Sequence, residues 1–371
     1  MKTARRIYRL AFIPVASIIL ALLVGSVLII ISSVVGPAQE LDLGLPLVAY
    51  GALLRGAVGG PTAIVNTIVA TAPLVLTGLA VGVGFKAGLF NIGGTGQVLV
   101  GGFCAALAGA AVASQPVPIA LTIAVLAGAL GGAAYGFIPG ALKAYTGAHE
   151  VVSTIMLNSL ASFAIVGLVN DAFKIAGPTF ARTASVGNAA LPILFGRNGN
   201  PGFVIALALI PITYWLLWRT TLGFEIRTVG ANPSAARYAG MNPRRLIVLT
   251  MSLCGLFAGL AGAIEILSLG YYPAVFGTTI GFAGITVALL GRSHPVGILL
   301  AAILLGGMRA GGSAMQIDAK VPVEIIDVIQ GLILLFLAAE IVVRRLFRVK
   351  AAGTTPDELQ TVSRTYGQGV A

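Results

Sequence analysis

Three polar side chains stand in an apolar part of the sequence where a helix would otherwise begin. Asn91, Thr95 and Gln97 lie among four glycines in Gly88-Leu-Phe-Asn-Ile-Gly-Gly-Thr-Gly-Gln97. Glycine-rich backbone at membrane depth persists only when it is buried in protein or lines a water-filled cavity. The segment therefore predicts a broken helix beside the path of a polar solute, with a plain glycine turn as the alternative. A nucleotide-binding loop does not fit, because the sequence contains no G-x-x-x-x-G-K-[ST].

A second polar group opens the apolar run that follows His149. Glu150 would lie in the first turn of this helix, where the helix dipole favours a carboxylate. Ser153, Thr154 and Asn158 place further polar atoms along it, and Thr154 and Asn158 share one face by their spacing of four. This face is predicted to look into the interior of a bundle, although helix capping alone would also explain Glu150.

A third segment, in the basic loop 219–245, has the signals of a short helix at both of its ends. Asn232 is a good N-cap, Pro233 suits the first helical position, and Gly240 can adopt the left-handed stop. Asn242 and Pro243 start the next apolar run in the same way. A small helix held between two long ones is suited to dock a soluble partner; an ordinary amphipathic loop is the alternative.

Composition excludes several classes of protein. Hydrophobic residues make up 57% of the 371 residues and charged residues only 9%, against about a quarter charged in soluble proteins. The net charge of +11 does not indicate nucleic acid, because the cations lie between apolar runs. His149 and His294 are too isolated for a metal site, and Cys104 and Cys254 are expected in the core. No catalytic or metal-binding residue is predicted.

About ten transmembrane helices follow from the apolar runs, since a span needs about 20 apolar residues. A separate amphipathic stretch covers Pro46–Ala57. The uncharged run Ala87–Leu142 is long enough for two spans broken at 114–118, and the others are Leu10–Val35, Pro61–Gly84, Val151–Asn170, Phe203–Trp218, Leu246–Leu267, Thr278–Gly291, Val296–Met308 and Val323–Val343. The run at the N-terminus is too long for a cleaved signal peptide. The fold class is therefore all-α and polytopic.

Lys and Arg in the loops give the expected orientation, because cytoplasmic loops hold the excess of cations. With the N-terminus inside, 17 of the 23 cations are cytoplasmic, while Arg55, Lys174, Arg182, Arg197, Arg309 and Lys320 are outside. Both termini are then cytoplasmic. We expect a transmembrane domain over 1–350, with 219–245 as a cytoplasmic loop, and a polar cytoplasmic tail over 351–371.

A stripe of small residues marks the run after the 114–118 break: Ala124, Gly128, Gly132, Gly136 and Gly140 are four residues apart. Such spacing brings another helix to backbone contact within a membrane. We expect a packing surface, with a contact that slides during transport as the alternative.

Four motifs together resemble the permease subunits of ATP-binding-cassette (ABC) importers for nucleosides and simple sugars, relatives of the ribose and branched-chain amino acid permeases. The resemblance covers about Pro61–Val343, and the motifs are 88–94, 149–158, 227–240 and 281–291. The Phe-Asn-Ile-Gly and His-Glu-Val versions are more similar to nucleoside permeases than to ribose permeases. Relatives often carry Glu where this chain has Thr95.

The resemblance implies a bundle of the type II ABC importer kind and two groups of functional residues. The expected coupling residues, which would dock on the ATPase, are Arg227, Val229, Gly230, Asn232, Pro233, Ala235, Ala236, Arg237, Tyr238 and Gly240. The expected solute-path residues are Phe90, Asn91, Thr95, Gln97, Glu150, Ser153, Thr154, Asn158, Phe282 and Thr286.

The implied machine contains two permeases, a cytoplasmic ATPase and an external substrate-binding lipoprotein in the cell membrane. The second permease is expected to be a different chain, and ATP-Mg is bound and hydrolysed by the ATPase, so this chain would carry no cofactor. A sugar permease, an ion-coupled secondary transporter and a passive channel remain as alternatives. A secondary transporter usually needs ionisable residues near mid-membrane, whereas Glu265, Glu324, Asp327 and Glu340 fall near the ends of the predicted spans.

Overall fold

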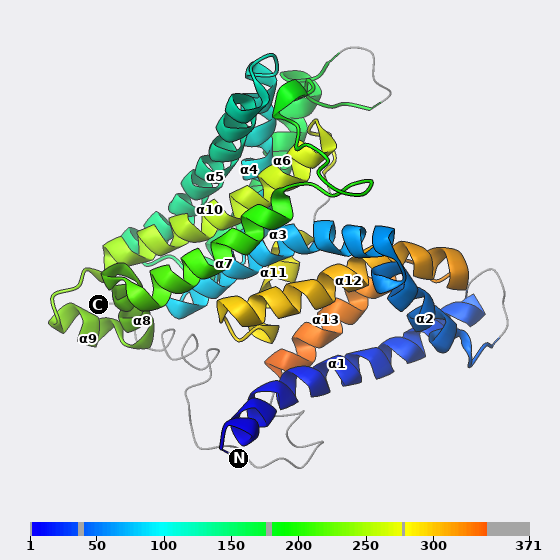
Figure 1. The fold of residues 1–371 in the computed structure, drawn as a ribbon. Helices are drawn as coiled ribbons and strands as arrows, with labels where there is room; N and C mark the ends of the chain where they lie inside the picture. The colour runs from blue at the N-terminus through cyan, green and yellow to red at the C-terminus, as the bar shows by residue number, and fades with distance from the viewer. Residues whose placement is uncertain (1, 36–40, 176–179, 277–278, 340–371) are drawn as a thin grey trace. The chain divides into compact units, whose positions relative to one another are not determined.

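The computed structural model describes residues 2–35, 41–175, 180–276 and 279–339. Within these residues the regular elements are helices, and two isolated β-bridges are the only extended pairings. Figure 1 shows the helices in chain order. They are α1 (Lys2–Val35), α2 (Leu45–Val58), α3 (Pro61–Lys86), α4 (Gly94–Ala111), α5 (Val117–Ala141), the π-turn η1 (Leu142–Thr146), α6 (Glu150–Asp171), the 3₁₀ turn η2 (Gly187–Ala189), α7 (Gly202–Arg219), α8 (Thr221–Ala231), α9 (Pro233–Tyr238), α10 (Pro243–Leu269), α11 (Ile280–Leu290), α12 (Pro295–Ala319) and α13 (Glu324–Ala338). The all-α fold is confirmed.

Eight of these helices are long and apolar enough to cross a membrane. They correspond to eight of the ten predicted spans. The other two are shorter: α11 has 11 residues, and the described part of α13 has 15. At 1.5 Å per residue, α11 measures only about 16 Å, roughly half of a hydrocarbon core. The predicted end of the last span at Val343 and the predicted tail 351–371 lie outside the described residues.

The predicted end of one span at Met308 is wrong, and this changes where Arg309 lies. The span expected over Val296–Met308 continues without a break to Ala319. Arg309 is therefore inside a helix and not in an outer loop. Neither Arg nor the glycines after it stop the helix; it ends where Lys320 takes a positive φ of 54° and Pro322 follows, a residue that cannot continue a helix.

The chain forms two compact units. Of the described residues, the smaller unit contains 2–35, 41–71, 196–198 and 303–339, and the larger unit contains 72–175, 180–195, 199–276 and 279–302. The smaller unit thus holds α1, α2, the first part of α3, the second part of α12, and α13. The larger unit holds the helices in between and all four motifs singled out in the sequence.

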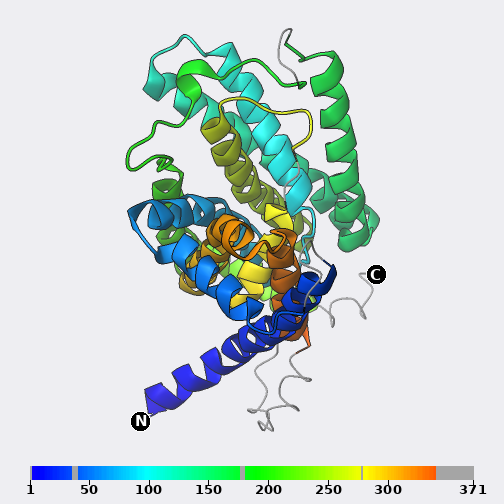
Figure 2. The same cartoon turned by 90° about the vertical axis from the view of Figure 1, so that its right-hand side faces the viewer.

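The core of the larger unit is a seam of glycines between α4, α5 and α10 (Figure 1 and Figure 2). Any Cβ added to Gly132 of α5 would lie 2.5 Å from the Gly259 Cα of α10. Gly262 of α10 lies equally tightly against the Val98 carbonyl of α4. Because dispersion forces and close packing drive helix association in lipid, the predicted stripe on α5 is confirmed as a packing surface.

In the smaller unit, α1 packs along α13 and against α2. The Tyr50 hydroxyl of α2 donates a 2.7 Å hydrogen bond to the Leu22 carbonyl of α1. At the far end of α12, Arg55 and Asp318 form an ion pair of 3.0 Å. The predicted amphipathic stretch is therefore a helix in its own right, bonded to α1 through Tyr50 and to α12 through Arg55.

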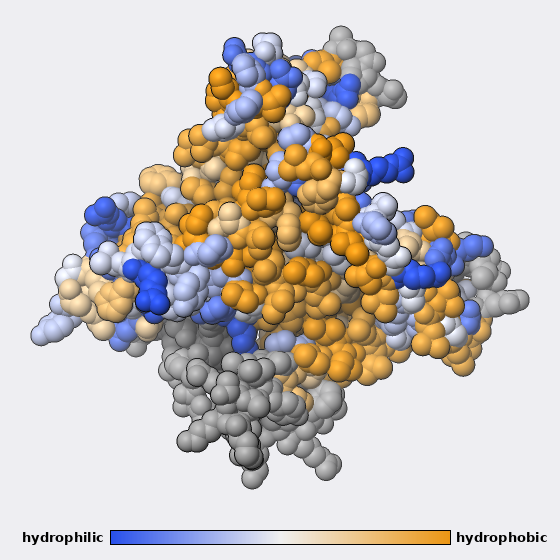
Figure 3. All heavy atoms as spheres, in the orientation of Figure 1, coloured by the Kyte–Doolittle hydropathy of each residue, from blue (hydrophilic) through white to orange (hydrophobic). Residues whose placement is uncertain are grey.

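The hydrophobic and hydrophilic side chains on the surface of the larger unit are distributed as expected for a helix bundle in lipid. Hydrophobic side chains cover the middle of α5, α7 and α10 in Figure 3, while hydrophilic side chains gather over α8 and α9 and over the loops at the opposite end. An apolar band between two polar ends is the pattern expected of a bundle that crosses a bilayer.

Candidate solute path and coupling surface

The break between α3 and α4 is closed by its own polar side chains. Asn91 is 1% exposed, and its Nδ2 donates to Gln97 Oε1 at 3.0 Å. The Gly93 amide donates to Asn91 Oδ1 at 2.9 Å. Phe90, next to them, stacks on Phe85 with ring centroids 5.4 Å apart. An irregular segment thus separates α3 from α4, and the two amides hold its shape.

Asn158 of α6 ties that break to a second helix. Its Nδ2 donates to the Ile92 carbonyl at 3.0 Å, and its Oδ1 accepts from the Gly96 amide at 2.7 Å. The side chain thus satisfies one backbone acceptor before α4 and one donor in its first turn, groups that a helix end leaves open. Thr154, one turn earlier and fully buried, donates to the Glu150 carbonyl at 2.7 Å.

The beginnings of α4 and α11 meet at two glycines. Gly281 of α11 lies against the backbone of Thr95, with room for no Cβ, and Gly94 faces Gly281 in return. Thr95 Oγ1 has no hydrogen-bond partner among the described residues. Phe282 is 51% exposed beside this meeting point, while Thr286, one turn further, is 3% exposed. Of the ten expected path residues, Phe282 is the most exposed.

The beginnings of both helices bring the positive ends of their dipoles to one place. Such a place suits hydrogen-bond acceptors on a neutral polar solute. The structure therefore places Thr95 against Gly281, the residue before Phe282. Hydrogen bonds of Asn91, Gln97 and Asn158 hold the backbone on either side of Thr95.

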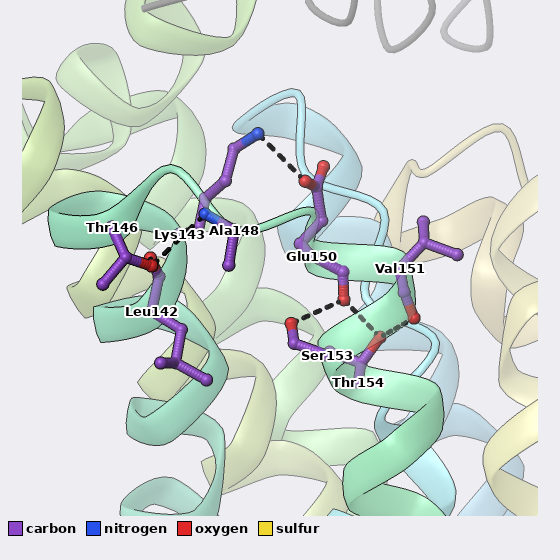
Figure 4. A network of polar contacts seen from close by, with 8 residues as sticks. All are labelled: Leu142, Lys143, Thr146, Ala148, Glu150, Val151, Ser153 and Thr154. Atoms are coloured by element: carbon purple, nitrogen blue, oxygen red, sulfur yellow. Dashed lines mark hydrogen bonds and ion pairs between the residues drawn. The ribbon is translucent and has the colours of Figure 1, made fainter.

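Glu150 has a partner that the sequence analysis missed (Figure 4). Its Oε2 lies 3.1 Å from Lys143 Nζ, and the two side chains are only 3% and 18% exposed. Lys143 lies in η1, and Gly147, with a φ of 72°, turns the chain from η1 toward α6. Ser153 Oγ also donates to the Glu150 carbonyl at 3.1 Å. Lys143 was detectable as the one cation between two apolar runs.

The predicted short helix in the basic loop is confirmed as α9. Asn232 Oδ1 accepts from the Ala235 amide at 3.0 Å, and Gly240 has a φ of 83°. Ala236 is fully buried, whereas Tyr238 is 96% exposed. Arg237 and Ala235 are exposed as well. The helix therefore packs on the protein through Ala236, while Ala235, Arg237 and Tyr238 are exposed.

The preceding helix, α8, connects α9 to the turn that follows α3. Gly230 packs against the backbone of Lys86, Ala87 and Gly88, and Val229 beside it is 3% exposed. No side chain fits between Gly230 and this turn. The backbone of α8 therefore lies directly against the turn that follows α3.

An aromatic cluster links the same region to the turn between α11 and α12. Trp218 of α7 lies 5.4 Å from the His294 ring, and Arg227 of α8 lies 6.0 Å above Trp218. Tyr214 stacks on Trp218 at 5.2 Å. Partial burial, and then the charge of Lys86, lower the pKa of His294, so its ring is neutral at pH 7. Sequence analysis identified Arg227 but not this cluster.

The long apolar helices, the interrupted helices and the capped loop helix define a multi-pass membrane permease. The chain belongs to the family described as branched-chain amino acid transport system / permease component, whose model matches residues 63–338. The chain is thus a transport subunit.

Three curated relatives are also ABC transporter permease proteins, and each aligns with most of this chain. The guanosine ABC transporter permease protein NupP of Bacillus subtilis is 38% identical over 90% of this chain and 94% of its own length. The nucleoside ABC transporter permease protein NupB of Lactococcus lactis subsp. cremoris is 32% identical over 90% and 92%. The glucose ABC transporter permease protein TsgB13 of Haloferax volcanii is 34% identical over 87% and 86%. No solved structure gives a significant match.

Proposed function

We propose that this chain is the permease subunit of an ABC importer that brings nucleosides into the cell. The observation that carries the proposal is the backbone contact of Gly230 with the turn 86–88. It joins a capped, exposed helix, suited to a soluble motor, to the broken helix that frames the candidate solute path. A passive channel would have no need of such a connection.

In this proposal, ATP-Mg is bound and hydrolysed by a separate cytoplasmic ATPase. ATP binding draws the two motor subunits together, and α9 carries the movement through α8 to the start of α4. The path alternates between outward and inward openings. The solute passes the meeting point of α4 and α11, where Thr95 and Phe282 would contact it.

The remaining parts of the machine belong to the proposal as well. A second, different permease would complete the path, and an external substrate-binding lipoprotein would deliver the solute. The transmembrane domain would cover 1–350 in the cell membrane, with the loop 219–245, the tail 351–371 and both termini in the cytoplasm. The cation count supports this orientation, since 17 cations fall on the inner side and five on the outer side once Arg309, which lies within α12, is left out.

Nucleosides are favoured over sugars by the relatives. Two of the three similar proteins are permeases for guanosine or nucleosides, and the most similar of the three is the guanosine one. The 34% identity to a glucose permease makes a simple sugar the second candidate.

Uptake of labelled guanosine, uridine, ribose and glucose, compared between cells with and without the gene, tests the proposal. We expect loss of nucleoside uptake in the deletion strain and unchanged uptake of both sugars. If the deletion strain lost only sugar uptake, the solute would be a sugar and not a nucleoside. If the uptake that requires the gene depended on a proton or sodium gradient and not on ATP, the ABC mechanism would be overturned.

A further inference from the structure

The turn between α11 and α12 has a backbone conformation that side chains rarely adopt. Arg292 and Ser293 have φ values of 52° and 48°, in the left-handed region that favours glycine. The Ser293 amide donates to the Ala288 carbonyl at 2.7 Å. The Arg292 amide donates to the Leu289 carbonyl at 3.0 Å, so α11 ends in a Schellman motif with arginine where glycine is usual. Such strained residues persist only where their surroundings hold them, and they gather in switch regions.

Backbone contacts on two sides hold this turn. Gly291 lies against the backbone of Gly297 and Ile298, with room for no Cβ. Ser293 is 1% exposed, and a Cβ added to Gly82 of α3 would lie 3.6 Å from the Ser293 Cα. The turn is thus fixed to the first turn of α12 and lies beside α3. This packing holds the left-handed torsions in place.

His294, the last residue of this turn, faces the two helices that come before α9. Its ring lies 5.4 Å from that of Trp218 and 5.8 Å from that of Tyr214, both on α7. The Arg227 guanidinium of α8 lies 6.0 Å from the centre of the Trp218 ring. The His294 side chain has no hydrogen bond or ion pair with any residue that the structure describes, so ring packing alone connects it to α7. The turn is thereby in contact with α7 and, through Trp218, with α8.

The opposite end of α11 lies at the candidate solute path. Gly281 packs on the backbone of Thr95 at the start of α4. Between its two ends α11 lies on α3, where Gly284 packs against Thr77. Since α11 has only 11 residues, about 16 Å separate its ends. One short helix thus leads from the contact with Trp218 to Thr95.

Two contacts therefore join the loop 219–245 to the meeting point of α4 and α11. Gly230 lies on the turn 86–88, which precedes α4. Arg227 lies over Trp218, which packs on the turn that follows α11. Arg227 and Gly230 are one turn apart on α8. The same helix is thus connected to both of the helices that meet at the candidate solute path.

We propose that the turn 291–294 is a second coupling contact, through which α8 acts on α11, and that His294 positions α11 through Trp218. This inference rests on the proposed import driven by ATP. A movement of α8 reaches Trp218 through Arg227, and the ring of His294 passes it to the turn. His294 is therefore a positioning residue, which acts on the path without touching the solute.

The backbone of the turn suits this role. Because the left-handed torsions of Arg292 and Ser293 are strained, a second conformation of the turn lies closer in free energy than it would at a relaxed turn. The turn changes conformation when α8 moves, and α11 then shifts at Gly281 against Thr95. Coupling thus reaches α11 as well as α4.

Transport by the complete importer in proteoliposomes tests the second contact. We expect His294→Ala to lower the maximal rate of guanosine uptake about threefold to tenfold, as for loss of one aromatic pair. The KM should change by less than about twofold, because His294 does not touch the solute. ATP hydrolysis should continue, so that more ATP is consumed for each guanosine. His294→Phe keeps an uncharged ring beside Trp218 and should restore the rate.

Two tryptophans of α7 give a matched comparison. Trp218→Ala should repeat the loss seen with His294→Ala. Trp215→Ala should transport at the wild-type rate, because Trp215 is 59% exposed and has no ring contact with a described residue. The double variant Trp218→Ala, His294→Ala should be no slower than either single variant, since all three remove one contact. Losses that multiply in the double variant, or a wild-type ratio of guanosine to ATP in His294→Ala, would overturn the second coupling contact.

Arg292→Gly tests the strained turn by itself. Glycine adopts the left-handed conformation without steric cost, so it favours the present conformation of the turn over a second one. We expect the unfolding temperature to stay the same or to rise by up to about 4 °C, and the maximal uptake rate to fall about threefold. Unchanged uptake would overturn the switching of the turn. A wild-type importer that hydrolyses ATP but moves no nucleoside would instead contradict the proposed function on which this inference rests.

Discussion

Gly230 of α8 packs on the main-chain carbonyl of Lys86 at the end of α3, and the space between them admits no Cβ. The contact places a helix of the basic loop directly on the turn that opens α4. A glycine at this position is therefore required by close approach and not by backbone torsion.

Replacement of Gly230 by Val is expected to abolish uptake. The side chain would push α8 off the turn 86–88, at a cost of about 1–3 kcal/mol from overpacking. Uptake per amount of inserted protein is the measurement. Gly51→Val, at a helical glycine with no atom within 4 Å of an added Cβ, is the control and should transport normally. Normal uptake with Gly230→Val would show that α8 does not couple to the turn.

Tyr238→Ala is expected to abolish ATP-driven uptake without loss of stability. Tyr238 is 96% exposed at the end of α9, and large exposed aromatic residues often dominate binding to a partner protein. Uptake and co-purification of the ATPase are the measurements. Tyr145→Ala, at a tyrosine that is 68% exposed in η1, is the control for loss of an exposed ring. Retained ATPase binding and uptake in Tyr238→Ala would remove α9 from the coupling assignment.

Ala235→Glu gives an independent test of the same surface. Ala235 is exposed, whereas Ala236 beside it is fully buried. A charge at Ala236 would damage packing, so only the change at Ala235 reports on docking. We expect normal membrane insertion and lost uptake. Unimpaired uptake would contradict the docking role of α9.

Glu150→Gln is expected to lower the stability of the larger unit by about 2–3 kcal/mol. The change leaves Lys143 without its carboxylate in a site where it is only 18% exposed, and removal of one partner of a buried pair is strongly destabilising. Because Lys143 is partly exposed, we expect this loss of stability to be at the low end of the range for buried pairs. The double variant Lys143→Met, Glu150→Gln should recover most of it. Thermal unfolding in detergent is the measurement, and equal stability of single and double variants would contradict a coupled pair.

Much of the fold could be predicted because it depends on local rules. Asn232, Pro233 and Gly240 specify the ends of α9 through capping and backbone torsion alone. Gly132 and its neighbours on α5 predict a close helix contact through their spacing. Charged residues and span length predicted the ends of helices less reliably. Arg309 indicated the end of a span because a cation in a membrane helix is rare, but nothing at Met308 or Arg309 ends the helix.

The candidate site was harder to predict because its contacts join distant parts of the chain. Asn91 and Gln97 are polar residues in a path-like segment, but their partners are each other. Asn158 reaches the Ile92 carbonyl across 66 positions, and no local pattern contains that information. The same holds for Gly230 and Lys86. Polar residue types show where a membrane protein departs from a plain helix, but not whether they face the solute or the backbone.

Gly132→Val is expected to prevent stable folding. Its added atoms would meet the backbone of Gly255 and Gly259, and two packed backbones cannot move aside as a flexible side chain can. Gly167→Val on α6, where no atom lies within 4 Å of an added Cβ, is the matched control. The amount of inserted protein and its unfolding temperature are the measurements. Wild-type values for Gly132→Val would contradict the static seam and favour a sliding contact.

The orientation of the chain is tested by Ser234→Cys, introduced after Cys104 and Cys254 are replaced by Ala. Ser234 is exposed in α9, so a thiol there would react readily with a maleimide if the reagent reaches its side of the membrane. With the basic loop in the cytosol, an impermeant maleimide should label this thiol in inside-out vesicles and not in intact cells. Lys174→Cys, in the expected outer loop, should show the opposite pattern. Labelling of Ser234→Cys from outside intact cells would invert the topology and place α9 where no ATPase can reach it.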